Sequence, residues 1–563
     1  MELSLHIVFL LCAAAVCVTC EQQPPSDEDW LELDTPQGPV RGRRDPDADH
    51  LYVFYNIPYV TTPTKENRYK PALPPPVWTE PFDAIDKGVI CPQPNVMNNL
   101  VRQEDCLIAN VFVPDTKRKK LSVLVYVHGG GFMGGYGDML KAKNLLKTKD
   151  IIMVNFNYRV GIHGFLCLGT EDVPGNVGMK DQVALLRWVQ KNIASYGGNP
   201  DDVTIAGYSA GSAAVDLLMI SKSAEGLFHR VIPESGANLA PFSIQRNPLE
   251  IAKKYAKDKY NFTGGDDIYA LEKFYKTAPI ELLSADTFLD RTDATFLFSP
   301  CIERETEDEA FLTESPLSIL KNGNYKKLPV LYGFAEKEGM WRLIAYDGFM
   351  NKMNEKFSDF LPPDLHFKSE EEKEAVADKI KKFYFGDKPV GNDQILKFID
   401  YYSEITFSFS MLWAVKLYVE SGHDQVYLYE YSFVDEETPL VPHTNVRGAE
   451  HCAQTYAVMD GKNPMEADES LLTPEHKEMK NIMRGIWHNF IKTGKPVPEG
   501  SSLPAWPATG ANGAPYMSLG QKVELRHEPL LETRYRFWED IYQKYYLEPI
   551  PPPARAPKPR TEL

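Results

Sequence analysis

The stretch VTIAGYSAGSAAVDLLMI, residues 203–220, decides the fold. Val203–Ala206 is a short β-branched run typical of a buried strand, and Ala213–Ile220 has the composition of a buried helix. Between them lies GYSAG, residues 207–211, which is G-x-S-x-G in the setting of strand, sharp turn and helix. The glycines leave room for a turn that lifts the hydroxyl of Ser209 above the sheet edge. Ser209 is therefore the candidate nucleophile.

Similar short apolar runs lie on both sides of this turn. Ser122–Val127 and Ile151–Phe156 precede it, Val330–Tyr332 and Val426–Tyr431 follow it, and the segment Asp181–Ile193 has helical apolar spacing. Strands that alternate with helices indicate an α/β fold with a large, mostly parallel and twisted central sheet flanked by helices. Residues 340–400, rich in Lys, Glu and Phe, are expected to form amphipathic helices that cover this sheet.

Composition narrows the class of protein. The 563 residues are 43% apolar and 25% charged, and no internal repeat or long linker interrupts residues 30–548. We expect one catalytic domain over residues 21–548. The net charge of −17 argues against a nucleic-acid partner, because such a chain repels a phosphate backbone. No stretch beyond the N-terminus approaches the length of a membrane span, so stable membrane insertion is not expected.

The two ends of the chain predict its compartment. Residues 1–20 are an apolar run with small residues at its end, which indicates a signal peptide and a secreted protein; an N-terminal anchor is the alternative. The Pro-rich residues 549–563 are expected to be a disordered tail. Its last four residues, RTEL, resemble an ER-retention signal, so the ER lumen is the alternative location. The sequon at Asn261 is a candidate glycosylation site.

A run of glycines supplies candidate donors for an oxyanion. HGGGF, residues 128–132, follows the strand Ser122–Val127 directly. Without a Cβ, the backbone N–H groups of Gly130 and Gly131 can turn toward a substrate carbonyl. Together with the amide of Ala210 they would form a three-donor oxyanion hole.

These motifs resemble the type-B carboxylesterase/cholinesterase family of α/β-hydrolases, and in appearance most closely the insect secreted carboxylesterases. Further similar segments are EDCL (104–107), NYR (157–159), NVG (176–178) and GGNP (197–200). FYNIPY (54–59) also matches, with Asn56 where the family has Gly. The resemblance covers nearly the whole mature chain.

The resemblance implies the partners of Ser209. In GFAEKEG, residues 333–339, it selects Glu338 as the acid, with Glu336 as the competitor. In GAEH, residues 448–451, it selects His451 as the base, with His443 as the rival. The order nucleophile, acid, base agrees with this fold. No metal or other cofactor is expected.

Other residues are carried over in the same way. Ser235, in an S-G segment, is expected to support the catalytic groups from behind. Phe132, Phe242 and Phe407 are candidates for the substrate pocket, with core packing as an equal alternative. The resemblance pairs Cys91 with Cys106 in a disulfide. No partners are evident for the family's second disulfide, so Cys167, Cys301 and Cys452 are expected to be free, buried thiols.

The expected activity is that of a serine carboxylesterase acting on small, uncharged and mostly apolar esters, such as odorant, pheromone or xenobiotic esters. Cholinesterases carry a Trp between the residues matching Cys91 and Cys106, and no Trp stands there in this chain. At the position of Tyr208, cholinesterases have Glu and juvenile hormone esterases have Gln. The alternatives are a non-catalytic adhesion protein of the neuroligin kind and an esterase that sequesters esters stoichiometrically. The sequence does not distinguish a monomer from a homodimer.

Overall fold

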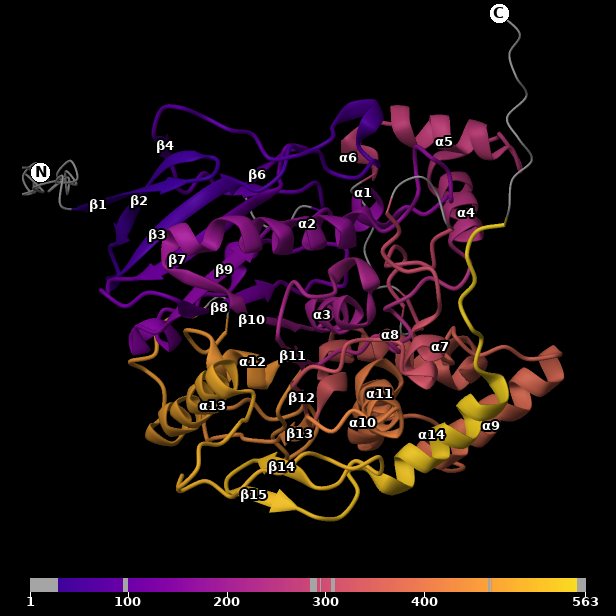
Figure 1. The fold of residues 1–563 in the computed structure, drawn as a ribbon. Coiled ribbons are helices and arrows are strands. Elements are labelled where there is room, and N and C mark those ends of the chain that lie inside the picture. The colour runs from indigo at the N-terminus through magenta and orange to yellow at the C-terminus, as the bar shows by residue number, and fades with distance from the viewer. Residues whose placement is uncertain are drawn as a thin grey trace, which may run out of the picture.

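One twisted sheet runs through the centre of the protein, here described from a computed structural model (Figure 1). The structure describes residues 29–94, 100–283, 291–293, 295–304, 309–463, 466 and 468–553. The sheet has 13 strands. Their order is β1 (Trp30–Thr35), β2 (Gly38–Asp45), β3 (Ala48–Pro58), β7 (Ile108–Pro114), β9 (Ile151–Phe156), β8 (Leu121–Val127), β10 (Gly198–Tyr208), β11 (Arg230–Glu234), β12 (Val330–Ala335), β13 (Val426–Tyr431), β14 (Tyr516–Leu519) and β15 (Val523–Arg526), with β4 (Phe82–Asp83) paired to β2. The strands β5 (Val89–Ile90) and β6 (Val101–Arg102) form a separate pair.

The central strands are parallel and the outer ones are not. Every neighbouring pair from β9 through β14 is parallel, whereas β1, β2, β3 and β7 join by antiparallel pairing, as does β15. This is the large, mostly parallel sheet that the sequence predicts. The five expected strands are present, and β10 begins earlier than its apolar run because GGNP at 197–200 leads directly into it.

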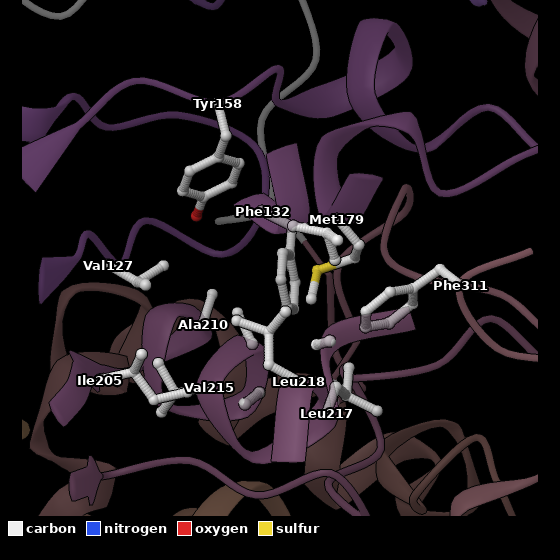
Figure 2. Close-up of a cluster of buried hydrophobic side chains, with 14 of the residues drawn as sticks. Val127, Phe132, Tyr158, Met179, Ile205, Ala210, Val215, Leu217, Leu218 and Phe311 are labelled. Carbon is white, nitrogen blue, oxygen red and sulfur yellow. The ribbon is translucent and has the colours of Figure 1, made fainter. Parts of the chain in front are cut away.

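Helices cover both faces of the sheet and bury two apolar clusters. On one face, α2 (Val177–Asn192), α3 (Ala210–Ile220) and α11 (Phe409–Glu420) pack against the strands. Figure 2 shows part of this cluster, where Val215 of α3 lies beside Ile205 of the sheet. On the other face, α12 (Ala453–Val458) and α13 (Pro474–Thr493) bury the second cluster. The remaining helices include α1 (Gly161–Phe165), α4 (Pro248–Tyr260), α5 (Ile268–Thr277), α6 (Ile280–Leu283) and α7 (Pro316–Asn322).

The helices within residues 340–400 form a third cluster of their own. These are α8 (Tyr346–Glu355), α9 (Glu370–Phe385) and α10 (Ile395–Ser403), and they pack on one another and on α14 (Glu532–Tyr545). The fully buried Trp538 of α14 lies among them. The segment is helical as expected. The expectation that it covers the sheet is wrong, because the apolar side chains of these helices pack against one another and against α14 near the end of the chain.

Two disulfides are present, one more than the sequence predicts. Cys91 and Cys106 are joined as expected. Cys167 and Cys301 are also joined, with 6.7 Å between their Cα atoms, so the expectation that both are free thiols is wrong. The two residues are 134 positions apart, and only the folding of the chain around Gly175 brings them together. Cys452 is free and buried, as expected.

The predicted signal peptide (residues 1–20) and the RTEL sequence lie outside the described residues. The start of the proline-rich tail is described through residue 553. Pro552 is buried next to Gly169, and Arg304 Nη1 donates to the Pro553 carbonyl at 3.4 Å. The part of the tail up to residue 553 therefore packs against the body of the protein. Within the described ranges, no helix is long and apolar enough to cross a bilayer.

Candidate active site

Ser209 stands on a tight turn between β10 and α3. Its backbone lies at φ 56°, ψ −124°, a conformation that L-residues seldom adopt. The flanking glycines are required by contact: a Cβ on Gly207 would come within 2.4 Å of the Gly211 carbonyl oxygen, and a Cβ on Gly211 within 2.2 Å of the Val127 carbonyl oxygen. Ser209 donates its backbone N–H to the Glu234 carbonyl at 2.9 Å. The turn is thus held from both neighbouring strands.

The structure brings Ser209, His451 and Glu338 into one hydrogen-bonded chain. His451 Nε2 lies 3.0 Å from Ser209 Oγ, and His451 Nδ1 is hydrogen-bonded to Glu338 Oε2. The side chain of Glu338 is fully buried, while that of His451 keeps 18% of its surface exposed. A buried carboxylate on one nitrogen of an imidazole favours the tautomer whose other nitrogen can accept a proton. This arrangement can deprotonate the serine hydroxyl.

The competing residues from the sequence do not join this chain. Glu336 forms an ion pair with Lys337 at 3.2 Å and is 39% exposed. His443 lies on an exposed turn. The backbone of Lys337 instead donates to the Ala449 carbonyl at 2.9 Å. This bond ties the loop that carries Glu338 to the loop that carries His451.

Residues at the end of β11 hold the acid and base loops from behind. Ser235 Oγ donates to Glu338 Oε1, which also accepts the Ala335 N–H at 2.9 Å. Gln454 Nε2 donates to Ser235 Oγ at 2.5 Å, so the loop after His451 meets the same hydroxyl. Ser235 therefore contacts both the acid and the loop that follows the base.

The side chain of Glu234 reaches the helix that follows His451. Its carboxyl group accepts hydrogen bonds from Thr455 Oγ1 at 2.5 Å, from Trp487 Nε1 at 3.2 Å and from the Tyr429 hydroxyl. Burial raises the pKa of the Glu234 carboxyl group to about 7, although the hydrogen bonds from these donors act to lower that pKa. Nothing in the local sequence marks this residue, because its partners come from three distant segments.

The three candidate oxyanion donors come from the glycine loop after β8 and from the residue after Ser209. Gly130, Gly131 and Ala210 make no hydrogen bond through their N–H groups to another part of the described chain. Gly130 and Gly131 have φ of 111° and 64°. A Cβ on Gly130 would lie 2.3 Å from the Gly134 carbonyl oxygen, so only glycine fits there. These groups are free to bind an oxyanion.

The three candidate pocket phenylalanines are all buried and differ in the rings that they contact. Phe132 packs edge-to-face on Phe165 with ring centroids 5.1 Å apart and points into the core cluster (Figure 2). Phe407 stacks on the imidazole of His451 at 4.3 Å, and Phe242 packs on Phe407 at 5.6 Å. All three rings are buried in the same apolar cluster, in which Phe407 contacts the base and Phe242 contacts Phe407.

Two further aromatic residues pack on Phe242 and Phe407, and together the four form an aromatic wall beside His451. Phe296 packs on Phe242 at 5.1 Å, and Trp341 lies 6.3 Å from Phe296 and 6.4 Å from Phe407 between ring centroids. Sequence reasoning missed both. Trp341 follows Glu338 by three residues, a spacing that places it near the acid, whereas no local signal marks Phe296. The surroundings of His451 are therefore apolar and aromatic.

Tyr208, which precedes Ser209 in the sequence, and Cys452, which follows His451, are uncharged. The hydroxyl of Tyr208 lies 3.5 Å from Met139 Sδ. Burial raises the pKa of the Cys452 thiol well above its ordinary value, so this neighbour of His451 stays protonated. In the described part of the chain, no group of three or more His, Cys, Asp and Glu side chains could hold a metal ion.

Comparisons with known proteins agree with this geometry. The family model described as "Carboxylesterase family" matches residues 29–538. "Juvenile hormone esterase" from Heliothis virescens is 30% identical over 548 residues, covering 92% of this chain and 95% of that protein. "Liver carboxylesterase 1" from Oryctolagus cuniculus is 27% identical and covers 92% and 94%. The crystal structure of juvenile hormone esterase from Manduca sexta, with OTFP covalently attached, superposes with a TM-score of 0.80 at 28% identity, covering 91% of this chain and 100% of that one.

Proposed function

The chain belongs to the carboxylesterase family and is a carboxylic-ester hydrolase, and from that premise we propose that it cleaves uncharged, mostly apolar esters through an acyl-enzyme on Ser209. The observation that carries the proposal is the hydrogen-bonded chain from Ser209 through His451 to the buried Glu338. A serine hydroxyl is a weak nucleophile by itself, and such a chain supplies the base that it needs.

The mechanism follows from these contacts. His451 Nε2 takes the proton of Ser209 as Oγ attacks the ester carbonyl, and the N–H groups of Gly130, Gly131 and Ala210 stabilise the oxyanion. His451 then protonates the leaving alcohol. A water molecule, deprotonated by His451, attacks the acyl-enzyme and releases the carboxylic acid with Ser209 restored. Glu338 orients the imidazole and stabilises its charged form throughout.

The substrate class follows from the side chains around the base. Phe242, Phe407 and Trp341 favour apolar groups, and the neutral Tyr208 gives no charge to attract an ammonium group. We infer that odorant, pheromone or xenobiotic esters suit this site. Two relatives are named for juvenile hormone, so esters of that hormone belong in the same substrate panel.

Hydrolysis of p-nitrophenyl acetate and 1-naphthyl acetate by the wild type and by Ser209→Ala tests the proposal. The variant should lose about 10⁶-fold in kcat and its labelling by an organophosphate. Ser212→Ala is the matched control, since Ser212 lies on the helix that follows Ser209 and its hydroxyl donates to the Gly236 carbonyl at 2.7 Å. Full activity in Ser209→Ala would refute the assignment of the nucleophile.

A second pair of variants tests the acid. Glu338→Gln should lower kcat by about 10⁴-fold, because the amide favours the wrong imidazole tautomer. Glu336→Gln, two residues away, should retain nearly all activity, since its side chain faces Lys337 and solvent. Equal losses in the two variants would overturn the choice of Glu338.

The same assays distinguish the alternatives. A wild type without a burst, without turnover and without organophosphate labelling would favour a non-catalytic adhesion protein. One equivalent of product for each site, followed by a halt, would favour stoichiometric sequestration. Sustained turnover that saturates with substrate is the result we expect.

We also propose that the protein is secreted and carries a glycan on Asn261. Two disulfides suit an oxidising compartment, and Asn261 and Thr263 are both exposed just after α4. Expression in eukaryotic cells, followed by assay of medium and lysate, tests secretion. Deletion of the last four residues should leave the distribution unchanged if RTEL is not a retention signal.

A further inference from the structure

The amino-terminal ends of the central strands form the edge of the sheet that lies opposite Ser209. Many positively charged side chains are found at this edge. The parallel strands β8, β9, β11 and β12 all begin at this edge, while the glycine loop, Ser209 and Glu338 follow the other ends of β8, β10 and β12. The two edges of the sheet therefore face in opposite directions, and a ligand bound at one does not cover the other.

Several exposed cations precede these strands. We define the basic edge as Lys117–Lys120 before β8, Lys147 and Lys149 before β9, Lys326 and Lys327 before β12, and Lys495 after α13. All of these side chains are exposed. The chain as a whole has a net charge of −17, so this edge is opposite in sign to the rest of the molecule.

Contacts join neighbouring segments at this edge of the sheet. Lys119 Cδ lies within 3.9 Å of the Cβ position of Gly197, just before β10. The Cβ position of Gly494 lies 3.1 Å from Pro329 and 3.5 Å from Arg230 Nε, which joins the end of α13 to the starts of β11 and β12. With neighbouring strands about 4.8 Å apart, the row from β9 to β12 spans about 19 Å.

The carboxylates on this edge do not neutralise it. Asp202 pairs with Arg230, Asp150 with His488 and Asp115 with Arg44, none of which belongs to the basic edge. No ion pair joins a residue of the basic edge to a carboxylate anywhere in the described ranges. The exposed acids that remain nearby are Asp201, Glu225 and Asp424. The positive charge is therefore available to a partner.

The partner must be anionic, and its surface need not be apolar. The large hydrophobic side chains that are exposed elsewhere, such as Leu73, Val77, Ile344 and Leu471, do not lie in the segments of the basic edge. A lipid surface and a single-stranded nucleic acid both favour exposed apolar or aromatic side chains beside the cations. In the described segments of this edge, the aromatic side chain beside the cations is the half-buried Tyr325, whose ring centroid lies 5.9 Å from Lys327 Nζ. A run of lysines and arginine on an exposed loop suits a linear polyanion of the heparin type.

We propose that the basic edge binds a sulfated polysaccharide and that the bound protein presents the Ser209 edge to solvent. This attachment is independent of ester hydrolysis, because the reacting groups lie at the other ends of the strands. It would hold a negatively charged enzyme on a negatively charged matrix through one face, with an affinity that falls as salt rises.

Elution of the full chain from immobilised heparin in a salt gradient tests the proposal. Lys117→Gln/Arg118→Gln/Lys119→Gln should elute at lower salt than the wild type, and its Kd for heparin at 0.15 M NaCl should rise at least about tenfold. Lys326→Gln/Lys327→Gln should show a smaller shift in the same direction, since these residues lie at the far end of the row. Turnover of 1-naphthyl acetate should be unchanged in both variants.

A matched control removes three positive charges elsewhere. Lys352→Gln/Lys382→Gln/Lys388→Gln changes exposed lysines of α8, α9 and the turn after α9 and should elute with the wild type. An equal shift in this control would show that only net charge matters and would overturn the proposal. So would failure of the wild type to bind heparin at 0.15 M NaCl, or binding only to vesicles of phosphatidylserine and phosphatidylcholine or to duplex DNA. Equal binding to unsulfated hyaluronan would refute the role of sulfate. A change of oligomeric state in place of heparin binding, measured by sedimentation, would assign the edge to self-association.

Discussion

Removal of the disulfide between Cys167 and Cys301 should destabilise the protein more than removal of the other disulfide. The bond closes a loop with a sequence separation of 134 residues, compared with 15 for Cys91 and Cys106. In the chain-entropy account, these separations correspond to about 5 kcal/mol and about 3 kcal/mol at 25 °C. The perturbation is the double variant Cys167→Ser/Cys301→Ser, which removes both sulfur atoms of the pair and leaves Cys452 as it is in the wild type.

The native surroundings of this disulfide should persist in the variant. Asn176 donates from Nδ2 to the Cys301 carbonyl at 2.8 Å and accepts the Cys301 N–H at 2.8 Å, so the loop keeps its backbone anchor without the sulfur bond. Gly175 leaves the space in which both sulfur atoms lie. Most of the loss should therefore come from the greater freedom of the unfolded chain.

The assay is urea unfolding followed by tryptophan fluorescence, with Cys91→Ser/Cys106→Ser as the matched control. The Cys167/Cys301 variant should have the lower midpoint and a larger m-value than the wild type, because its unfolded state is less restricted. Thiol titration of the denatured, unreduced protein without residues 1–20 should find one thiol, that of Cys452. Three thiols, or identical midpoints for the wild type and the Cys167/Cys301 variant, would refute the reasoning.

Three further results are expected. Phe407→Leu removes the ring that stacks on His451 and should lower kcat for 1-naphthyl acetate about tenfold with a smaller change in KM; an unchanged kcat would contradict a positioning role. Burial raises the pKa of Glu234 from 4.5 to about 7, so the folded state holds a proton that the unfolded state has lost, and stability should fall as pH rises from about 4.5 to 7. Glu234→Gln should reduce that difference when Tm is compared at pH 5 and pH 7.5, and a slope as steep as that of the wild type would argue against Glu234 as its source. Asn261→Gln should remove a mass shift that glycosidase treatment also removes, and identical migration of both proteins would show an unmodified asparagine.

Local sequence was sufficient to predict the elements whose conformation depends mainly on neighbouring residues. The strand, turn and helix around Ser209 follow from neighbouring residues. Gly207 is needed by a contact with Gly211 within the turn itself, and Gly211 by a contact with the Val127 carbonyl of the adjacent strand. The expected strands followed from apolar runs that a parallel sheet buries on both faces. Glu338 and His451 needed the family resemblance, since glutamate and histidine are common and only their motifs single them out.

Long-range contacts explain what the sequence did not predict. Cys167 and Cys301 are separated by 134 residues and meet only in the folded chain, so the spacing of the cysteines in the sequence does not predict that they pair. Phe296 reaches the wall around the base from a segment without regular structure. The apolar face of a helix can pack on a sheet or on another helix, so the pattern in residues 340–400 does not name the partner. In the structure these helices pack on α14, which comes from the far end of the chain.

The order of strands explains why the catalytic groups can meet at all. Ser209 follows β10 and Glu338 follows β12, so β11 separates them by about 10 Å in the sheet. An imidazole with one hydrogen bond on each side is long enough to bridge two side chains at that separation, and His451 does so. The end of β11 also fills the space beneath the bridge: the Glu234 carbonyl accepts from Ser209, and the Ser235 hydroxyl donates to Glu338. The strand β11 therefore supports both the nucleophile and the acid. The spacing of the strands in the sheet fixes the distance between the two side chains.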